Sequence, residues 1–173
     1  MDKATDRESN FLAAAKQGDL QIIKDLYQGG VNINVGEVNT GLTALHLSVA
    51  SHENDVFDYL LEQDDVDVNV TNSKGRTPIT QAVLSENKYA IGKLLEQEDI
   101  DLTLKETDSL KTVFAWADIK GHKEISKILS NKSGVPLQED GCFISKKRGH
   151  SSYNPYQTGG GYFFGDDTCD GGD

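Results

Sequence analysis

The amino-acid sequence predicts an all-α solenoid in which short helix–turn–helix units stack side by side. The first observation is an internal repeat: Gly-Leu-Thr-Ala-Leu-His-Leu-Ser at 41–48 returns 34 residues later as Gly-Arg-Thr-Pro-Ile-Thr-Gln-Ala at 75–82. The second is that Tyr-Leu-Leu-Glu-Gln at 59–63 returns with the same offset as Lys-Leu-Leu-Glu-Gln at 93–97. Self-similarity at a fixed period of roughly 20–50 residues marks a repeat architecture.

The repeated block resembles the ankyrin-repeat family. That family has a period of about 33 residues and a Thr-Pro-Leu-His-x-Ala signature that opens the first of two helices. The resemblance covers four repeats, good in the middle two and degenerate in the outer two, at about 10–36, 38–71, 72–105 and 107–133. It implies an ankyrin-repeat solenoid with short β-hairpin-like fingers. Residues 1–9 form a polar segment before the array, and residues 134–173 form a tail after it.

Composition narrows the class of protein. The formal net charge of -11 argues against a nucleic-acid partner, because phosphate binding needs a clustered basic face. It weakly favours a basic protein partner. No apolar run approaches the ~18 residues that span a bilayer, and no apolar signal core lies near Met1. The cysteines, Cys142 and Cys169, both lie in the tail, which suits a reducing compartment.

From these features we expect a cytoplasmic monomer without a metal or a cofactor. The nucleus and the interior of a host cell stay open as alternative locations. No contact with a membrane or with nucleic acid is expected.

The first repeat is expected to be a helix–turn–helix without a leading turn. Asn10 can cap a helix over residues 11–15, since a short polar side chain satisfies free amides at a helix start. Residues 1–9 are expected to be frayed, with some helix support. Gly18 ends the first helix, and Gly29 ends a second one in which four apolar residues recur at helical spacing: Leu20, Ile22, Ile23 and Leu26.

Residues 31–35 alternate apolar and polar side chains beside Gly36, and this period of two is typical of a strand or a finger. The same pattern returns at 66–70 and at 100–104. In the ankyrin fold, segments of this kind form the hairpin-like fingers that join neighbouring repeats.

The second and third repeats have clear helix starts. Thr43 can cap the inner helix of the second repeat, and Thr77-Pro78 is a strong opening in the third, because Thr supplies a cap oxygen and Pro needs no donor at the first helical position. The second repeat is expected to bury Leu45, Ser48, Val49, Val56, Phe57, Tyr59 and Leu60. The third is expected to bury Ile79, Ala82, Val83, Ile91, Leu94 and Leu95.

The fourth repeat departs most from the pattern. Leu110 stands where a turn glycine is expected, and Thr-Val-Phe-Ala at 112–115 replaces Thr-Pro-Leu-His. Gly121-His122 and the apolar residues after it restore the pattern. We interpret this unit as a C-terminal closing repeat, whose outer face is polar enough to meet water through Lys120, Lys123, Glu124 and Lys127.

The tail from Gly134 holds nine of the seventeen glycines, which favours disorder. Its aromatic residues favour at least one docked segment. Two interpretations stay open: an extended strand that lies on the array, or a short linear motif for another protein.

The resemblance implies a protein-binding concave side built from finger tips and inner helices. The positions that it assigns to the fingers are Asn39, Thr40, Leu42, Ser73, Lys74, Arg76, Asp108, Ser109 and Lys111. Those that it assigns to the inner helices are Leu47, Gln81, Leu84, Ser85, Trp116, Ile119 and Lys120.

Three of these positions carry two interpretations each. Leu84 and Ile119 form either an apolar groove for a partner or tail, or ordinary packing between repeats. Trp116 is either a binding hot spot, because Trp is enriched at binding centres, or a core residue. His46 belongs to the repeat signature, where the resemblance implies a hydrogen bond between loops rather than chemistry.

An enzyme is the remaining alternative, with Cys142, His150 and Cys169 as a thiol–imidazole pair or part of a zinc site. Structural zinc normally needs four ligands with a close pair such as Cys-x2-Cys, and these spacings do not supply one. We therefore predict a non-enzymatic protein-binding module, an adaptor, scaffold or inhibitor. A tail that occupies the groove and is displaced by a partner is the regulatory alternative.

Overall fold

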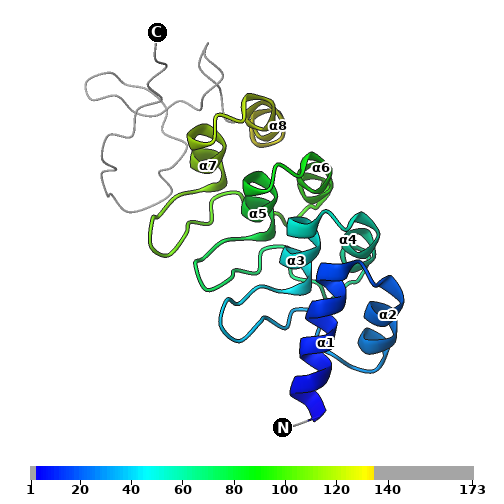
Figure 1. Cartoon of the computed structure of the whole chain (residues 1–173). Coiled ribbons are helices and arrows are strands. Elements are labelled where there is room, and N and C mark those ends of the chain that lie inside the picture. Colours follow the sequence, from blue (N-terminus) through cyan, green and yellow to red (C-terminus); the bar gives the residue numbers. More distant parts are fainter. Residues whose placement is uncertain (1–2, 135–173) are drawn as a thin grey trace, which may run out of the picture.

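The computed structural model describes residues 3–134, which form eight helices in four antiparallel pairs (Figure 1). Their bounds are α1 Lys3–Gln17, α2 Leu20–Gln28, α3 Ala44–Ser51, α4 Asn54–Leu61, α5 Pro78–Leu84, α6 Lys88–Glu96, α7 Val113–Ile119 and α8 Lys123–Ser133. The inner helices α1, α3, α5 and α7 stack in one row, and the outer helices α2, α4, α6 and α8 stack in a second row. The predicted all-α ankyrin-like solenoid is confirmed.

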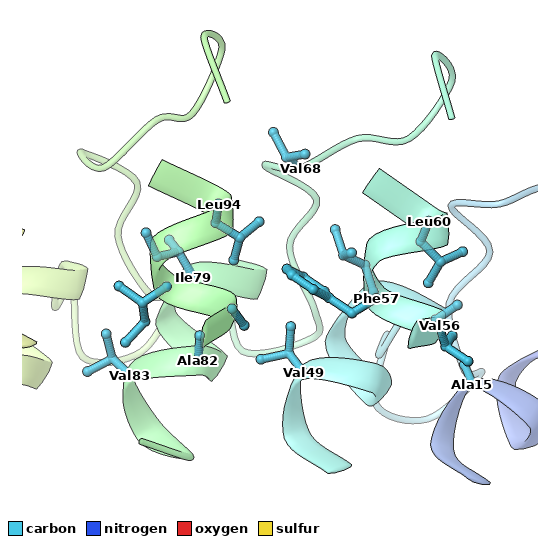
Figure 2. Packing of buried hydrophobic residues seen from close by; sticks show 14 of the residues in the cluster. Ala15, Val49, Val56, Phe57, Leu60, Val68, Ile79, Ala82, Val83 and Leu94 are labelled. Carbon is cyan, nitrogen blue, oxygen red and sulfur yellow. The ribbon is translucent and has the colours of Figure 1, made fainter. Parts of the chain in front are cut away.

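The core runs without a break from pair to pair, because no single pair is large enough to bury its own apolar side chains. Figure 2 shows Val49 and Phe57 pointing from the second pair toward the third, where Ile79 and Leu94 are fully buried. Burial of one such side chain stabilises the fold by about 1.5–3 kcal/mol. The array is therefore held together mainly by contacts between neighbouring pairs.

The predicted core is confirmed except at one position. Leu45, Ser48, Val49, Val56, Phe57 and Leu60 in the second pair, and all six residues predicted for the third pair, are buried. Tyr59 was predicted to be buried too, and this is wrong. It is only partly covered, because it lies edge-on to Tyr27, with ring centroids 6.4 Å apart, and Lys24 Nζ lies 5.2 Å from its ring.

The first helix begins earlier than the sequence predicts. Asn10 lies in the middle of α1, so the prediction that it caps this helix is wrong. The polar residues before Asn10 continue the helix because Arg7 holds them against the end of α2. Arg7 Nη2 donates a hydrogen bond of 2.8 Å to the carbonyl of Gly29. Gly18 and Gly29 end α1 and α2 as predicted.

Residues 31–35, 66–70 and 100–104 are loops that come before the fingers, so the prediction of a strand or a finger at these residues is wrong. Their alternation still sorts side chains, since Val31, Ile33 and Val68 point into the core. The polar side chains between them bind the next loop. Asn34 Nδ2 donates to Asp65 O over 2.7 Å, and Asn34 Oδ1 accepts from Asp67 N over 2.8 Å.

Asn69 makes the same pair of hydrogen bonds one repeat later, to Asp99 O and from Asp101 N, each 2.8 Å long. One side-chain amide thus reproduces the two-point pairing of a β-bridge at each junction. The protruding fingers come after these loops, at 37–42, 72–76 and 106–111 (Figure 1). Within the described residues, one isolated antiparallel β-bridge pairs Gly36 with Thr43 at the base of the first finger.

Each inner helix after the first starts at a threonine, as predicted for Thr43 and Thr77. Thr77 Oγ1 accepts from Thr80 N over 3.4 Å, and Thr112 Oγ1 accepts from Ala115 N over 3.5 Å. At the start of α3, Thr43 N donates to His46 Nδ1 instead, over 3.4 Å. These caps fix where each finger ends and each inner helix begins.

The turns use left-handed backbone at equivalent places. In the fingers, Gly41, Gly75 and Leu110 have φ values of 65°, 74° and 53°, so Leu110 adopts the conformation of the glycine it replaces. His52 and Glu86 do the same between paired helices, where Gly18 and Gly121 stand in the outer repeats. A non-glycine residue in this region is strained by about 1–2 kcal/mol.

Candidate protein-binding surface

Each finger is closed by an acceptor side chain on its first residue. Glu37 accepts a hydrogen bond from the Thr40 hydroxyl, and Glu106 accepts one from the Ser109 hydroxyl. In the middle finger Asn72 Oδ1 accepts from the backbone N–H groups of Lys74 and Arg76, over 2.9 and 3.1 Å. The finger tips therefore have a fixed shape before any partner binds.

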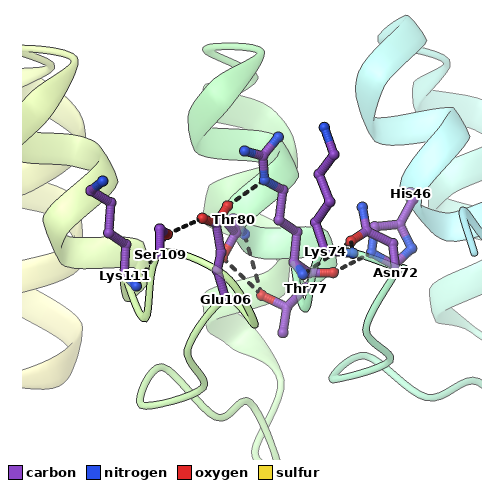
Figure 3. Close-up of polar contacts among 9 residues, drawn as sticks. His46, Asn72, Lys74, Thr77, Thr80, Glu106, Ser109 and Lys111 are labelled. Atoms are coloured by element: carbon purple, nitrogen blue, oxygen red, sulfur yellow. Dashed lines mark hydrogen bonds and ion pairs between the residues drawn. The ribbon is translucent and has the colours of Figure 1, made fainter. Parts of the chain in front are cut away.

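The tips are also joined to one another. Ser73 N donates to Thr40 O over 2.9 Å, and Thr107 N donates to Lys74 O over 3.0 Å. These bonds link the first finger to the second and the second to the third. Figure 3 shows Lys74 of the second finger and Glu106, Ser109 and Lys111 of the third, with the hydrogen bond from Ser109 to Glu106. We call the surface formed by the three fingers and the inner helices α3, α5 and α7 the finger face.

His46 connects α3 to the second finger. Its Nε2 lies 2.9 Å from the carbonyl oxygen of Arg76. Because Nδ1 accepts from Thr43 N, Nε2 carries the hydrogen and donates it to that carbonyl. Burial lowers the pKa of His46, so the ring is neutral at pH 7. The implied hydrogen bond between loops is therefore present.

A cluster of charge surrounds Trp116, on α7. The Arg76 guanidinium carbon lies 5.2 Å from the centre of its ring, and Lys111 Nζ lies 5.5 Å from it. Arg76 Nε donates to Glu106, whose carboxylate is buried with only 5% of the residue exposed. Cations at these distances are attracted to the face of an aromatic ring. Two fingers and one inner helix thus meet at this tryptophan.

Comparison with known proteins identifies the family of this chain. A family model described as "Ankyrin repeats (3 copies)" matches residues 11–106, more than half of the chain. The chain belongs to the ankyrin-repeat family. The fourth helix pair of this ankyrin protein, α7 and α8, lies beyond the matched residues.

One relative is an ankyrin repeat protein of Fowlpox virus (strain NVSL), FPV031. It is 26% identical over 148 residues, which cover 83% of this chain and 42% of the relative. The ankyrin chain thus spans about two fifths of the length of that relative. This similarity supports the family assignment and does not identify a binding partner.

The ankyrin fold places the residues predicted for binding in two groups. The exposed group consists of Asn39, Thr40, Ser73, Lys74, Asp108, Ile119 and Lys120. The half-buried group consists of Leu42, Leu47, Arg76, Gln81, Leu84, Ser85, Ser109, Lys111 and Trp116. Leu47 and Trp116 also pack against the core, whereas Ile119 keeps 49% of its surface exposed.

Sequence reasoning missed three features of the finger face. Glu106 was not predicted to be buried, yet only 5% of it is exposed and it pairs with Arg76. Val38 and Leu110 are finger residues whose side chains stay 90% and 44% exposed. The missing glycine at 110 was the one available signal for this last position.

The described residues offer no group of three or more His, Cys, Asp or Glu that could hold a metal ion. Within the same residues, no helix is long and apolar enough to cross a membrane. Cys142, His150 and Cys169, proposed for an enzyme, lie outside the described residues. His122 occupies the N-cap position of α8, and only 15% of its side chain is exposed.

Proposed function

We propose that this ankyrin protein is a non-enzymatic binding module that holds a partner protein on its finger face. Ankyrin repeats generally mediate protein–protein interaction, and the finer assignment to the finger face is our proposal. Adaptor, scaffold and inhibitor are all roles that such binding supports. The sixteen positions predicted from the sequence are the proposed contact region.

The observation that supports this surface best is the placement of exposed apolar side chains. Of the five large hydrophobic side chains that are exposed in the described residues, three lie on the finger face: Val38, Leu110 and Ile119. Apolar side chains in water mark surfaces that gain free energy when a partner covers them. The other two, Ile22 and Tyr89, lie apart from each other on the outer helices α2 and α6.

Rigidity is the second support. The finger tips are closed by their own acceptors and joined by backbone hydrogen bonds, so their order exists before binding. A preformed surface loses little conformational entropy when it binds, which leaves more of the contact free energy as affinity.

The test uses affinity capture from a native lysate with matched variants of the full chain. Leu84→Ser/Trp116→Ala/Ile119→Ser should abolish capture. Because Trp116 also packs against the core, Ile119→Asp serves as a second variant that removes only an exposed side chain. Ile22→Asp on α2, whose side chain is 38% exposed, is the matched control on the outer face.

Circular dichroism must show that each variant keeps its helices. The proposal requires that Ile119→Asp lowers capture while Ile22→Asp does not. If both variants capture the same proteins as the parent, this surface is not where the partner binds.

A further inference from the structure

The net charge of -11 is not spread evenly over the molecule. Residues 53–67, which cover α4 and the loop after it, hold seven carboxylates and no Lys or Arg. The inner helices α3 and α5 carry no Asp, Glu, Lys or Arg at all. Charge on the finger face comes from its fingers and from the end of α7, where four cations, Lys74, Arg76, Lys111 and Lys120, balance four carboxylates, Glu37, Glu106, Asp108 and Asp118.

The Trp116 cluster has more donors than acceptors. Glu106 is its one buried carboxylate, and it already accepts from Arg76 Nε and from the Ser109 hydroxyl. Within the described residues the Lys111 ammonium has the face of Trp116 as its contact and no carboxylate within ion-pair distance. Lys74, on the neighbouring finger, is exposed and has no ion pair there either.

Trp116 adds a further donor. Its Nε1–H is buried and has no hydrogen-bond acceptor among the described residues. A buried donor without an acceptor costs free energy, roughly 1–3 kcal/mol, until an acceptor reaches it. The cations of Arg76 and Lys111, from two different fingers, therefore lie at one place around an aromatic ring whose own N–H is unsatisfied.

We propose that this cluster receives a carboxylate from an acidic segment of the partner protein, with apolar side chains of the same segment on Leu110 and Ile119. The proposal rests on the proposed function and names the chemical class of its partner. Arg76 and Lys111 supply charge-assisted hydrogen bonds, which are about twice as strong as neutral ones. Glu106 holds Arg76 in place and is a positioning residue.

A protein segment fits this cluster better than nucleic acid does. Phosphate backbones are bound by rows of basic residues, each neutralising one phosphate. Here the cations are few and Asp108 is exposed beside them. The acidic stretch at 53–67 would also repel a polyanion that extends beyond the cluster. A short peptide that brings one or two carboxylates avoids this repulsion.

The experiment pans short random peptides displayed on phage against the full chain. Bound phage are kept only if protein carrying the uncharged change Ile119→Ser does not retain them, so that every kept peptide uses the finger face. The readout is the net charge of the kept peptides. The proposal predicts that Asp and Glu are enriched and that binding weakens as salt rises.

A kept acidic peptide is then synthesised together with its Gln/Asn analogue. The chain has a single Trp, so Trp116 emission reports binding at the cluster directly. The acidic peptide should shift the emission and bind at least roughly tenfold more tightly than the neutral analogue, a difference of about 1.4 kcal/mol. Lys111→Glu should remove that preference, whereas Lys88→Glu on the outer helix α6 should keep it.

Three outcomes overturn the proposal. Peptides that use the finger face but are basic or neutral would leave the proposed function standing and refute the acidic class. Peptides whose binding is unaffected by Ile119→Ser throughout would refute the proposed function as well. Replacing Asp166, Asp167, Asp170 and Asp173 by Asn in the full chain tests the chain's own acidic end. If peptide affinity then rises, that end occupies the cluster in place of a partner.

Discussion

Leu95→Ala should separate the last helix pair from the rest of the array. Leu95 is 4% exposed on α6 and lies beside Ile128 of α8, in the groove where the third pair meets the fourth. Replacing a buried Leu by Ala in a core costs about 2–5 kcal/mol. In a stacked array each interface contributes to stability mainly through its nearest neighbours, so the loss falls on the junction of these two pairs.

The chain carries its own probe for this junction. Trp116 is its single Trp and lies on α7, in the fourth pair, while circular dichroism follows all helices at once. In urea, the parent should show one transition by both methods. In Leu95→Ala the Trp116 transition should occur at lower urea than the loss of helix signal.

Leu61→Ala is the matched control. The equivalent residue of the second repeat, Leu61, is only half-buried, so its loss should be at or below about 2 kcal/mol. It should not separate the two probes at the C-terminal end. An unaltered urea transition for Leu95→Ala, or coincident transitions after a large loss of stability, would refute nearest-neighbour coupling at this junction.

Three further changes test other parts of the structure. Leu110→Gly should raise stability by about 1 kcal/mol, measured by urea unfolding, because it relieves a φ of 53°. Asn69→Ala should lower it by about 1–3 kcal/mol, because Asp99 O and Asp101 N lose their partner. Burial lowers the pKa of His46 below its ordinary value of 6.5, so its contribution to folding stability is fully present above pH 6.5. That contribution is lost as the pH falls toward the lowered pKa, because the unfolded chain then binds the proton more readily than the folded one. The free energy of unfolding of His46→Thr should fall less steeply with falling pH than that of the parent, and an equal slope would contradict this.

The helices were predictable because their signals are local. Thr-Pro at 77–78 starts a helix in any context that permits one, and Gly30, whose φ of 85° is left-handed, ends α2 with a conformation that favours glycine. The 34-residue period then supplied what single helices cannot, namely which faces meet. This is why Ile79, Ala82 and Leu94, all fully buried, could be assigned to the core from the sequence alone.

What escaped prediction depends on partners distant in the chain. Asn10 looked like a cap because nothing nearby shows that Arg7 binds the end of α2, 22 residues further on. The burial of Glu106 was not predicted because its partner, Arg76, lies 30 residues away. Alternation at 31–35 looked like a strand because burial of every second residue does not require a ladder. The bonds that replace the ladder come from side chains.

Because the finger tips are hydrogen-bonded to one another, a ligand that displaces one finger should also displace its neighbours. A ligand that tilts the last finger must break the bond from Thr107 N to Lys74 O, which costs about 1 kcal/mol, or else move the middle finger with it. The bond from Ser73 N to Thr40 O passes the same demand to the first finger. A ligand bound at Leu110, on the third finger, should therefore also shift Val38, on the first finger.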